Sequence, residues 1–179
     1  TDPTGRGRVA NWNPSAAQLN FGGAMGSNGV IFPGSRINLR DITDGSTQTI
    51  MIGEQSDKQD DNRVLSPTWS RKDLRGSLRA GMWTSSSLPP QAVPMAGCCA
   101  GSDGASMTTV VHKINQKARL GTDDGMGRYG WSTPIQSIHA GGAHVLRCDG
   151  GAQFLNENMN MDTFRFLIIR DDNQVISNY

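Results

Sequence analysis

Three side chains in the C-terminal third of the chain, His139, His144 and Asp149, are of types that bind metal ions or transfer protons. Imidazole and carboxylate groups ligate zinc and act as general acids and bases. If residues 143–148 form a strand, Asp149 lies about 16 Å from His144, because an extended chain rises about 3.3 Å per residue. The two side chains then cannot hold one ion unless the strand is broken. We therefore expect structural roles, with His139 hydrogen-bonded to its own loop and Asp149 to the amides of a turn.

Sequence motifs of the common catalytic sites are missing. The sequence contains no Gly-x-Ser-x-Gly, no phosphate-binding Gly-x4-Gly-Lys and no His-Glu-x-x-His. We therefore expect a protein that is not an enzyme, and keep a metal-dependent hydrolase centred on His139 as the last alternative. The 17 basic and 16 acidic residues are nearly balanced. Because binding a phosphate backbone needs a clustered excess of Lys and Arg, we expect no nucleic-acid partner.

An acidic cluster, Asp57, Asp60 and Asp61, offers oxygen atoms of the kind that Ca²⁺ prefers. Its spacing does not fit the EF-hand pattern. We therefore expect a solvated acidic loop and no bound cofactor, with Ca²⁺ as the one alternative.

The four tryptophans raise the possibility of stacking against a sugar ring. Trp83 and Trp131 stand in strand-like stretches and are expected in the core. Trp12 and Trp69 lie among Asn and Pro residues, which makes them the candidates for a contact surface. A carbohydrate- or surface-binding module that uses loops at 56–80 and 85–107 is therefore the first alternative function.

The three cysteines, Cys98, Cys99 and Cys148, allow one disulfide. Neighbouring cysteines bridge only with strained geometry, so a Cys98–Cys99 bond is disfavoured. In an exported protein Cys148 can pair with Cys98 or Cys99, and the third thiol then stays free or pairs with another segment.

Glycine makes up 22 of the 179 residues, about 12% against an average of roughly 7%. Such a composition favours short strands joined by long loops. The expected strands are residues 35–41, 49–54, 81–84, 107–112 and 175–176. The expected helical pieces are a single turn over 41–44 that ends at Gly45, a short helix over 71–78, and a helix capped by Asp162 that carries Phe164, Leu167 and Ile168 on one stripe.

The C-terminal third contains the strongest local signal. Residues 143–148 and 151–155 are apolar-containing runs separated by Asp149 and Gly150, both of which can adopt positive φ. This pattern predicts a β-hairpin. The fold class is therefore α+β and strand-dominated, with an antiparallel sheet, a C-terminal hairpin, one short C-terminal helix and many long loops. We expect a single domain over 1–179, with an irregular lead-in at 1–29 and long loops at 85–107 and 115–134.

Two blocks, residues 29–54 and 137–155, together resemble a known family. Nine residues separate His139 from the pair Asp149 and Gly150, and this spacing is similar to the signature of the prepilin-type, processing-associated His-x9-Asp-Gly proteins, which are pseudopilin-like proteins of type II secretion with undetermined function. The positions that carry the resemblance, for which we expect structural roles, are Asp41, Asp44, Gly45, Gly53, Glu54, His139, Gly141, Gly142, Asp149 and Gly150.

The resemblance implies a β-rich pilin-like head that follows a cleaved basic leader and a long apolar anchoring helix. No apolar run here reaches the roughly 18 residues needed to cross a bilayer, so we expect the chain to be the head region without that helix. We expect a non-enzymatic structural or interaction subunit, displayed at the bacterial cell surface or in the periplasm. Its implied partners are other pilin-like subunits, including its own copies, or secretion machinery. Contact with the membrane is expected only through the missing helix.

Overall fold

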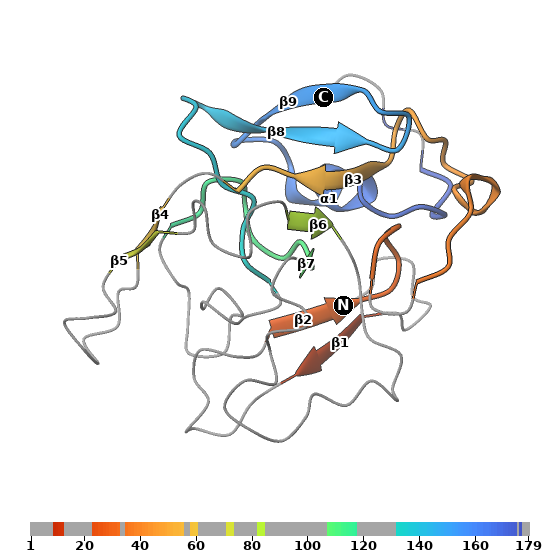
Figure 1. The fold of residues 1–179 in the computed structure, drawn as a ribbon, viewed down its shortest axis with the longest axis horizontal. Helices are drawn as coiled ribbons and strands as arrows, with labels where there is room; N and C mark the ends of the chain where they lie inside the picture. The colour runs from red at the N-terminus through yellow and green to blue at the C-terminus, as the bar shows by residue number, and fades with distance from the viewer. Residues whose placement is uncertain are drawn as a thin grey trace.

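Strands dominate the part of the chain that the computed structural model describes. The described residues are 9–12, 23–32, 35–55, 58–60, 71–73, 82–84, 107–117, 132–174 and 176. A five-stranded sheet has the order β7-β6-β3-β8-β9 and is antiparallel except for the parallel pair β6 and β7 (Figure 1). Its strands are β3 (Ile50–Gly53), β6 (Met82–Thr84), β7 (Met107–Thr108), β8 (Gly142–Arg147) and β9 (Ala152–Asn156). The expected strand-dominated α+β class is confirmed.

Two smaller pairs and two short helical pieces complete the described elements. Strands β1 (Val9–Trp12) and β2 (Gly23–Gly26) form one antiparallel pair, and β4 (Lys58–Asp60) and β5 (Arg71–Asp73) form another. The α-helix is α1 (Met161–Phe166), and a 3₁₀ turn covers Leu39–Asp41. Among the described residues, neither helical piece has the length and apolar character that crossing a membrane requires.

The hairpin predicted from Asp149 and Gly150 is confirmed. β8 and β9 pair from Gly142 opposite Asn156 to Leu146 opposite Ala152. In the connecting turn, the Asp149 Oδ1 atom accepts a hydrogen bond from the Gly151 N–H group at 2.8 Å, and Gly150 has a φ of 89°. Only Gly150 of the central pair takes positive φ, so the aspartate contributes its side-chain oxygen to the turn and not a left-handed backbone.

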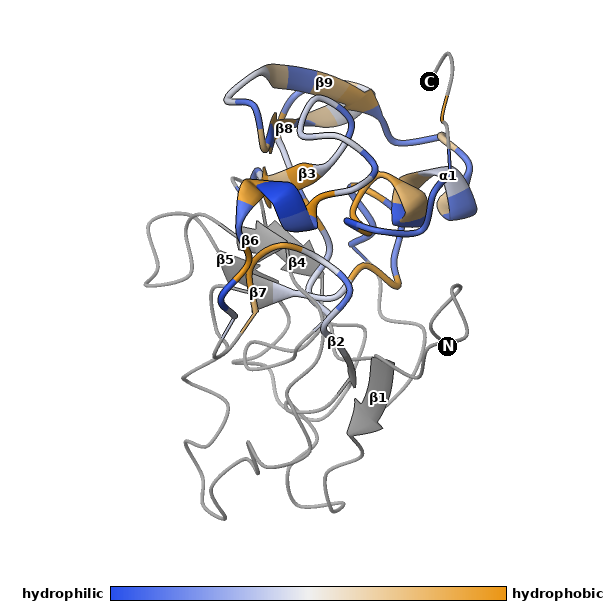
Figure 2. Cartoon of the chain, turned by 90° about the vertical axis from the view of Figure 1, so that its right-hand side faces the viewer, coloured by the Kyte–Doolittle hydropathy of each residue, from blue (hydrophilic) through white to orange (hydrophobic). Residues whose placement is uncertain are grey.

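The core lies between the sheet and α1. Figure 2 shows hydrophobic segments on β3, β8 and β9. The buried cluster consists of Ile50, Ile114, Ile135, Ala143, Val145, Leu155, Phe164, Leu167 and Ile168. Phe164 is only 1% exposed and lies in the core with Leu167 and Ile168, as predicted. The helix is shorter than predicted, because α1 ends at Phe166 and the other two residues follow it in a turn. The predicted cap is wrong, because the Asn160 Oδ1 atom accepts the N–H groups of Asp162 and Thr163 and so caps α1.

The strand predicted over 35–41 is wrong. Residues 35–38 form no regular element, and the 3₁₀ turn Leu39–Asp41 follows with Leu39 72% exposed. The reason is local: the Asp41 Oδ2 atom accepts hydrogen bonds from the Asn38 backbone N–H at 2.8 Å and from Asn38 Nδ2 at 3.2 Å. Such side-chain bonds compete with strand pairing. The helical turn therefore comes two residues earlier than the predicted 41–44.

Other predicted elements differ in extent. Residues 49–54 and 81–84 contain β3 and β6 as expected, whereas the strand predicted over 107–112 is limited to the two residues of β7. The helix predicted over 71–78 is wrong at its start, because Arg71–Asp73 is β5 and pairs with β4; residues 74–78 lie outside the described residues. Of the predicted final strand, Val175 is outside the described residues and Ile176 belongs to no strand. Within the expected lead-in, β1 and β2 are paired.

The segment after α1 is tied to the first half of the chain by Asp44 and Arg170. The Asp44 carboxylate accepts the backbone N–H groups of Asp172 at 2.7 Å and Asn173 at 2.8 Å. The Arg170 Nη1 atom donates to the carbonyl oxygen of Ser27 and to that of Gly29, each at 2.6 Å. Asp44 therefore joins the segment after α1 to the turn that follows the 3₁₀ turn.

Replacement of Asp172 by Asn is expected to stabilise the protein at neutral pH. Burial raises the pKa of Asp172 from 3.8 to about 6, and the nearby Asp44 and Asp171 carboxylates contribute to the same rise. Its Oδ2 atom is buried without a hydrogen-bond partner among the described residues. The folded state therefore keeps this proton while the unfolded state releases it, so stability falls as pH rises from about 4 to about 6.

Asp172→Asn removes this loss and places an amide beside the Asp44 carboxylate. Because the side chain is partly exposed, solvent screening reduces the gain to about 1 kcal/mol at pH 7, and the gain vanishes near pH 3.5. Urea unfolding at both pH values measures it. Asp162→Asn, which changes an exposed carboxylate, serves as the control and is expected to shift stability by only a few tenths of a kcal/mol. An equal effect of Asp172→Asn at both pH values would contradict the assignment.

Candidate functional site

Pairing of β3 with β8 brings Glu54 against His144. Glu54 follows the last residue of β3, and its backbone N–H donates to the His144 carbonyl oxygen at 3.0 Å. In return, the His144 N–H donates to the Glu54 Oε2 atom at 2.9 Å. The carboxylate is therefore fixed to the neighbouring strand through that strand's own backbone.

A second histidine reaches the same carboxylate from the segment that precedes β8. An isolated parallel bridge joins Gln55 to Gln136, and the Gln136 N–H donates to the Glu54 carbonyl oxygen at 3.1 Å. Three residues further on, the His139 N–H donates to the Ser137 Oγ atom at 3.1 Å. The chain along 136–139 therefore runs beside the end of β3 and carries His139 to Glu54.

The three side chains form a compact cluster, which we call the Glu-His-His cluster (Glu54, His139 and His144). The Glu54 Oε1 atom is 3.6 Å from His139 Nε2, and Oε2 is 3.6 Å from His144 Nδ1. The imidazole rings meet edge to face with centroids 4.9 Å apart. Both histidine side chains are 51% exposed and the glutamate side chain 21%, so the cluster is open to solvent and can accept a ligand from it.

Neighbouring apolar side chains pack against this cluster and against the strand that leads to it. The Phe154 ring on β9 meets the His144 ring edge to face at a centroid distance of 5.1 Å. Gly53, directly before Glu54, has no room for a side chain, because a Cβ there would overlap the Ile135 side chain. The group that approaches Gly53 closely is therefore a core side chain.

Asn115 fastens the loop that carries His139. Its Oδ1 atom accepts the Ser137 N–H at 2.8 Å, while its Nδ2 atom donates to the Glu157 carboxylate at 2.8 Å and to the Gly142 carbonyl oxygen at 3.3 Å. Asn115 adopts a φ of 61° to do so, a conformation that asparagine tolerates better than most residues. No sequence pattern singled out this residue.

Of the three sequence candidates, the structure brings His139 and His144 together and leaves Asp149 apart from them. Asp149 lies in the β8–β9 turn and takes no part in the Glu-His-His cluster, whose ligand atoms are close enough together to hold a metal ion. Glu54 was expected to be structural, with no link to the histidines. One feature of the sequence could have indicated the role of Glu54. It stands at the end of the predicted strand over 49–54, and a strand has to pair with a neighbour.

The remaining candidates lie mostly beyond what the structure describes. Five of them are outside the described residues: Asp57, Asp61, Trp69, Cys98 and Cys99. For two others, Trp12 and Asp60, only the backbone is described. Calcium binding and the Trp contact surface therefore stay predictions.

Cys148 forms no disulfide with any residue that the structure describes. Burial, with a smaller contribution from the Asp149 carboxylate, raises its pKa to about 11, so the thiol is protonated at neutral pH and is a poor nucleophile. Because Cys98 and Cys99 are outside the described residues, its disulfide with either of them stays a prediction.

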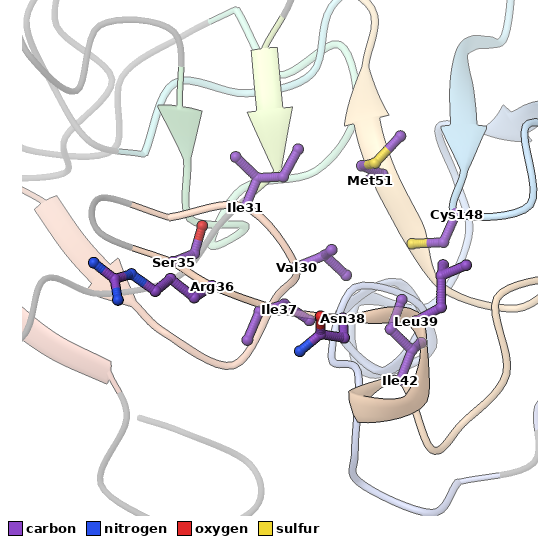
Figure 3. A pocket seen from close by; sticks show the side chains of 10 residues that line it. All are labelled: Val30, Ile31, Ser35, Arg36, Ile37, Asn38, Leu39, Ile42, Met51 and Cys148. Atoms are coloured by element: carbon purple, nitrogen blue, oxygen red, sulfur yellow. The ribbon is translucent and has the colours of Figure 1, made fainter.

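An apolar pocket of about 330 Å³ lies beside Cys148 and the 3₁₀ turn (Figure 3). We call it the Leu39 pocket. Its lining residues are Val30, Ile31, Ser35, Arg36, Ile37, Asn38, Leu39, Ile42, Met51 and Cys148. Leu39 is one of the three large hydrophobic residues that are exposed in the described part of the chain. The pocket therefore leaves apolar surface open to solvent.

These features define a strand-dominated α+β protein with a solvent-open cluster of two histidines and a glutamate. The chain belongs to the family described as "Protein of unknown function (DUF1559)", whose model matches residues 1–162. No curated protein and no solved structure matches the chain.

Proposed function

We propose that this protein is a non-enzymatic structural or interaction subunit, a pilin-like head that associates with other pilin-like subunits or with secretion machinery outside the cytoplasm. The observation that carries the proposal is the way in which the two blocks that resemble prepilin-type proteins meet. The Cys148 N–H donates to the Thr49 carbonyl oxygen at 2.9 Å, and the Asp149 N–H donates to the Ser46 carbonyl oxygen at 3.1 Å. The segment around Asp149 and Gly150 is thus bonded, backbone to backbone, to the segment that follows Gly45.

The hydrogen bonds of the signature aspartates support a structural role. The Asp44 carboxylate accepts two backbone N–H groups of the C-terminal segment, the Asp41 carboxylate accepts the Asn38 N–H, and the Asp149 carboxylate accepts the Gly151 N–H. Carboxylates in such bonds stabilise turns and segment ends. All three carboxylates are thus used in holding the backbone, which favours a scaffold over a catalyst.

The Leu39 pocket supports an interaction role. Exposed apolar surface that is hollowed and bordered by polar side chains is typical of protein contact sites. Here Leu39 stands 72% exposed beside the pocket, and Arg36 and Asn38 border it with polar groups. We assign the contact with a neighbouring subunit to this surface.

A site-specific crosslinking experiment tests the proposal. The full-length gene is expressed in its native bacterium with a photo-reactive amino acid in place of Leu39, and crosslinked products are identified by mass spectrometry. We expect crosslinks to a protein that itself carries a prepilin-type leader, or to a component of a secretion system. The control position is Asn158, which is exposed in the turn after β9 and is expected to give few crosslinks to the same partner. A protein that stays in the cytoplasm, or crosslinks that are the same from both positions, would reject it.

A further inference from the structure

We propose that the Glu-His-His cluster is a binding site for a divalent transition-metal ion, with Zn²⁺ as its best fit. The donor set of two imidazoles and one carboxylate is the argument from chemistry. Imidazole nitrogen suits Zn²⁺ and other late transition metals, whereas Ca²⁺ and Mg²⁺ take oxygen ligands. Three protein ligands with a fourth position open to water is a recurring zinc arrangement. The proposal goes beyond the subunit role and does not depend on it.

The distances within the cluster suit a single ion. Zinc binds histidine nitrogen at about 2.0–2.1 Å and carboxylate oxygen at about 2.0–2.2 Å, so tetrahedral ligand atoms lie roughly 3.4 Å apart. The Glu54 carboxylate reaches His139 Nε2 through Oε1 and His144 Nδ1 through Oε2, each at 3.6 Å. With one ligand atom taken from each residue, the three atoms lie within 4.8 Å of one another. Binding of one ion would draw these atoms closer together, which the half-exposed side chains of both histidines allow.

The cluster is held in place before any ion binds. The Glu54 Oε2 atom is fixed by the His144 backbone N–H, His139 is held through Ser137, and Ser137 is held in turn by Asn115. Three separate segments, the end of β3, the loop before β8, and β8 itself, thus supply one ligand each. Such preorganisation lowers the ordering cost of binding.

Solvent exposure leaves room for the rest of the coordination sphere. Both histidine side chains are about half exposed, so a water molecule can fill the fourth position. Without an ion, the same contacts amount to exposed pairs between histidine and glutamate, which contribute little to stability. A bound metal ion would stabilise this arrangement of two rings around one carboxylate more than these pairs do.

Titration of the whole chain with Zn²⁺ alone tests the site. The background variant carries Cys98→Ser, Cys99→Ser and Cys148→Ser, so that thiolates cannot contribute ligands. Calorimetry is expected to show one Zn²⁺ per chain, with an accompanying rise in the thermal unfolding midpoint. His139→Ala and His144→Ala should each weaken binding about 100-fold or more, because the loss of a mere outer-shell partner already costs 10–100-fold.

Two further variants separate metal binding from folding. Glu54→Gln removes the charged ligand but keeps an oxygen for the His144 N–H, so it should fold normally and lose most of the affinity. Asp162→Asn, which changes an exposed carboxylate on α1, should bind Zn²⁺ unchanged. If a histidine variant does not fold, the NMR signals of both imidazole rings are followed in the background protein during titration and are expected to shift together.

The proposal fails if the cysteine-free chain shows no saturable Zn²⁺ binding. It also fails if binding survives both histidine substitutions, or if the two ring signals do not respond together. Co²⁺ in place of Zn²⁺ gives an independent check, since nitrogen and oxygen ligands produce visible bands without thiolate charge transfer. The crosslinking result at Leu39 is unaffected by any of these outcomes, so the two proposals can fail separately.

Discussion

Replacement of Phe164 by alanine is expected to lower the free energy of unfolding by about 4 kcal/mol, since Phe→Ala changes in a packed core typically cost 3–5 kcal/mol. The ring is 1% exposed on α1 and packs in the cluster that contains Ile50 of β3, Val145 of β8 and Leu155 of β9. Removal of the ring therefore deletes the contacts that α1 makes with this cluster through Phe164. A cavity remains because strands that are hydrogen-bonded to each other cannot close around it.

A second phenylalanine provides the matched control. Phe154 lies on β9 and is 44% exposed, on the side of the strand that carries its ring to His144. Phe154→Ala should therefore cost less than about 1 kcal/mol, because much of the area that it removes already faces water. Urea unfolding followed by far-ultraviolet circular dichroism measures both changes. Equal losses for the two variants would mean that α1 does not close the core over the sheet.

The parts of the fold that can be predicted from the sequence are those fixed by near neighbours. The hairpin depends on Asp149 and Gly150, whose side-chain oxygen and positive φ act within the turn itself. The burial of Phe164, Leu167 and Ile168 follows from their spacing near the helical period, although the last two lie just after α1. Local chemistry decides these elements, so a sequence pattern is sufficient to predict them.

The errors arose where a distant partner or a competing side chain decides the outcome. Arg71–Asp73 is a strand because it pairs with Lys58–Asp60, and its charged sequence carries no sign of that pairing. The alternation of Ile37 and Leu39 predicted a strand, but the hydrogen bonds from Asn38 to Asp41 turn the chain first. Asn160 was missed as a cap because Asp162, two residues later, fits the same preference.

The Glu-His-His cluster cannot be predicted from spacing along the chain. Glu54 and His144 are 90 residues apart, and only the β3–β8 register brings them together. The sequence suggests His144 and Asp149 as partners because they are close along the chain, but an extended strand keeps them apart. The sequence pattern does not say which strand lies alongside. Long-range pairing is therefore the missing information for the site as well as for the fold.

Gly141 and Gly142 lie between His139 and the residues of β8 that follow. Replacement of each by alanine is expected to lower the free energy of unfolding by very different amounts. At Gly142, a Cβ would overlap the carbonyl oxygen of Leu155 and approach its carbonyl carbon to 2.9 Å. This obstacle is backbone of the paired strand β9 and cannot rotate away. Gly142→Ala should therefore cost about 3 kcal/mol, the upper end of what overpacking typically costs, and should part the ends of β8 and β9.

Gly141 is the adjacent control. It has a φ of 81°, and a Cβ added there would meet open space, with no atom within 4 Å. Gly141→Ala should therefore cost only the left-handed backbone penalty of about 1–2 kcal/mol. Urea unfolding ranks the two variants, and hydrogen exchange at the Ala143 and Leu155 amides reports whether the hairpin end has opened. A larger loss at Gly141 would show that backbone conformation, and not the approach of β9, limits this corner of the sheet.

The same pair of variants connects the hairpin to the Glu-His-His cluster. Gly142 begins the strand that carries His144, and the His144 N–H is the group that fixes the Glu54 carboxylate. Opening this end of β8 should therefore move His144 away from Glu54, whereas Gly141→Ala leaves the pairing of β8 with β9 in place. Because the site exists only where β3, β8 and β9 are in register, its geometry is expected to report on the sheet as directly as unfolding does.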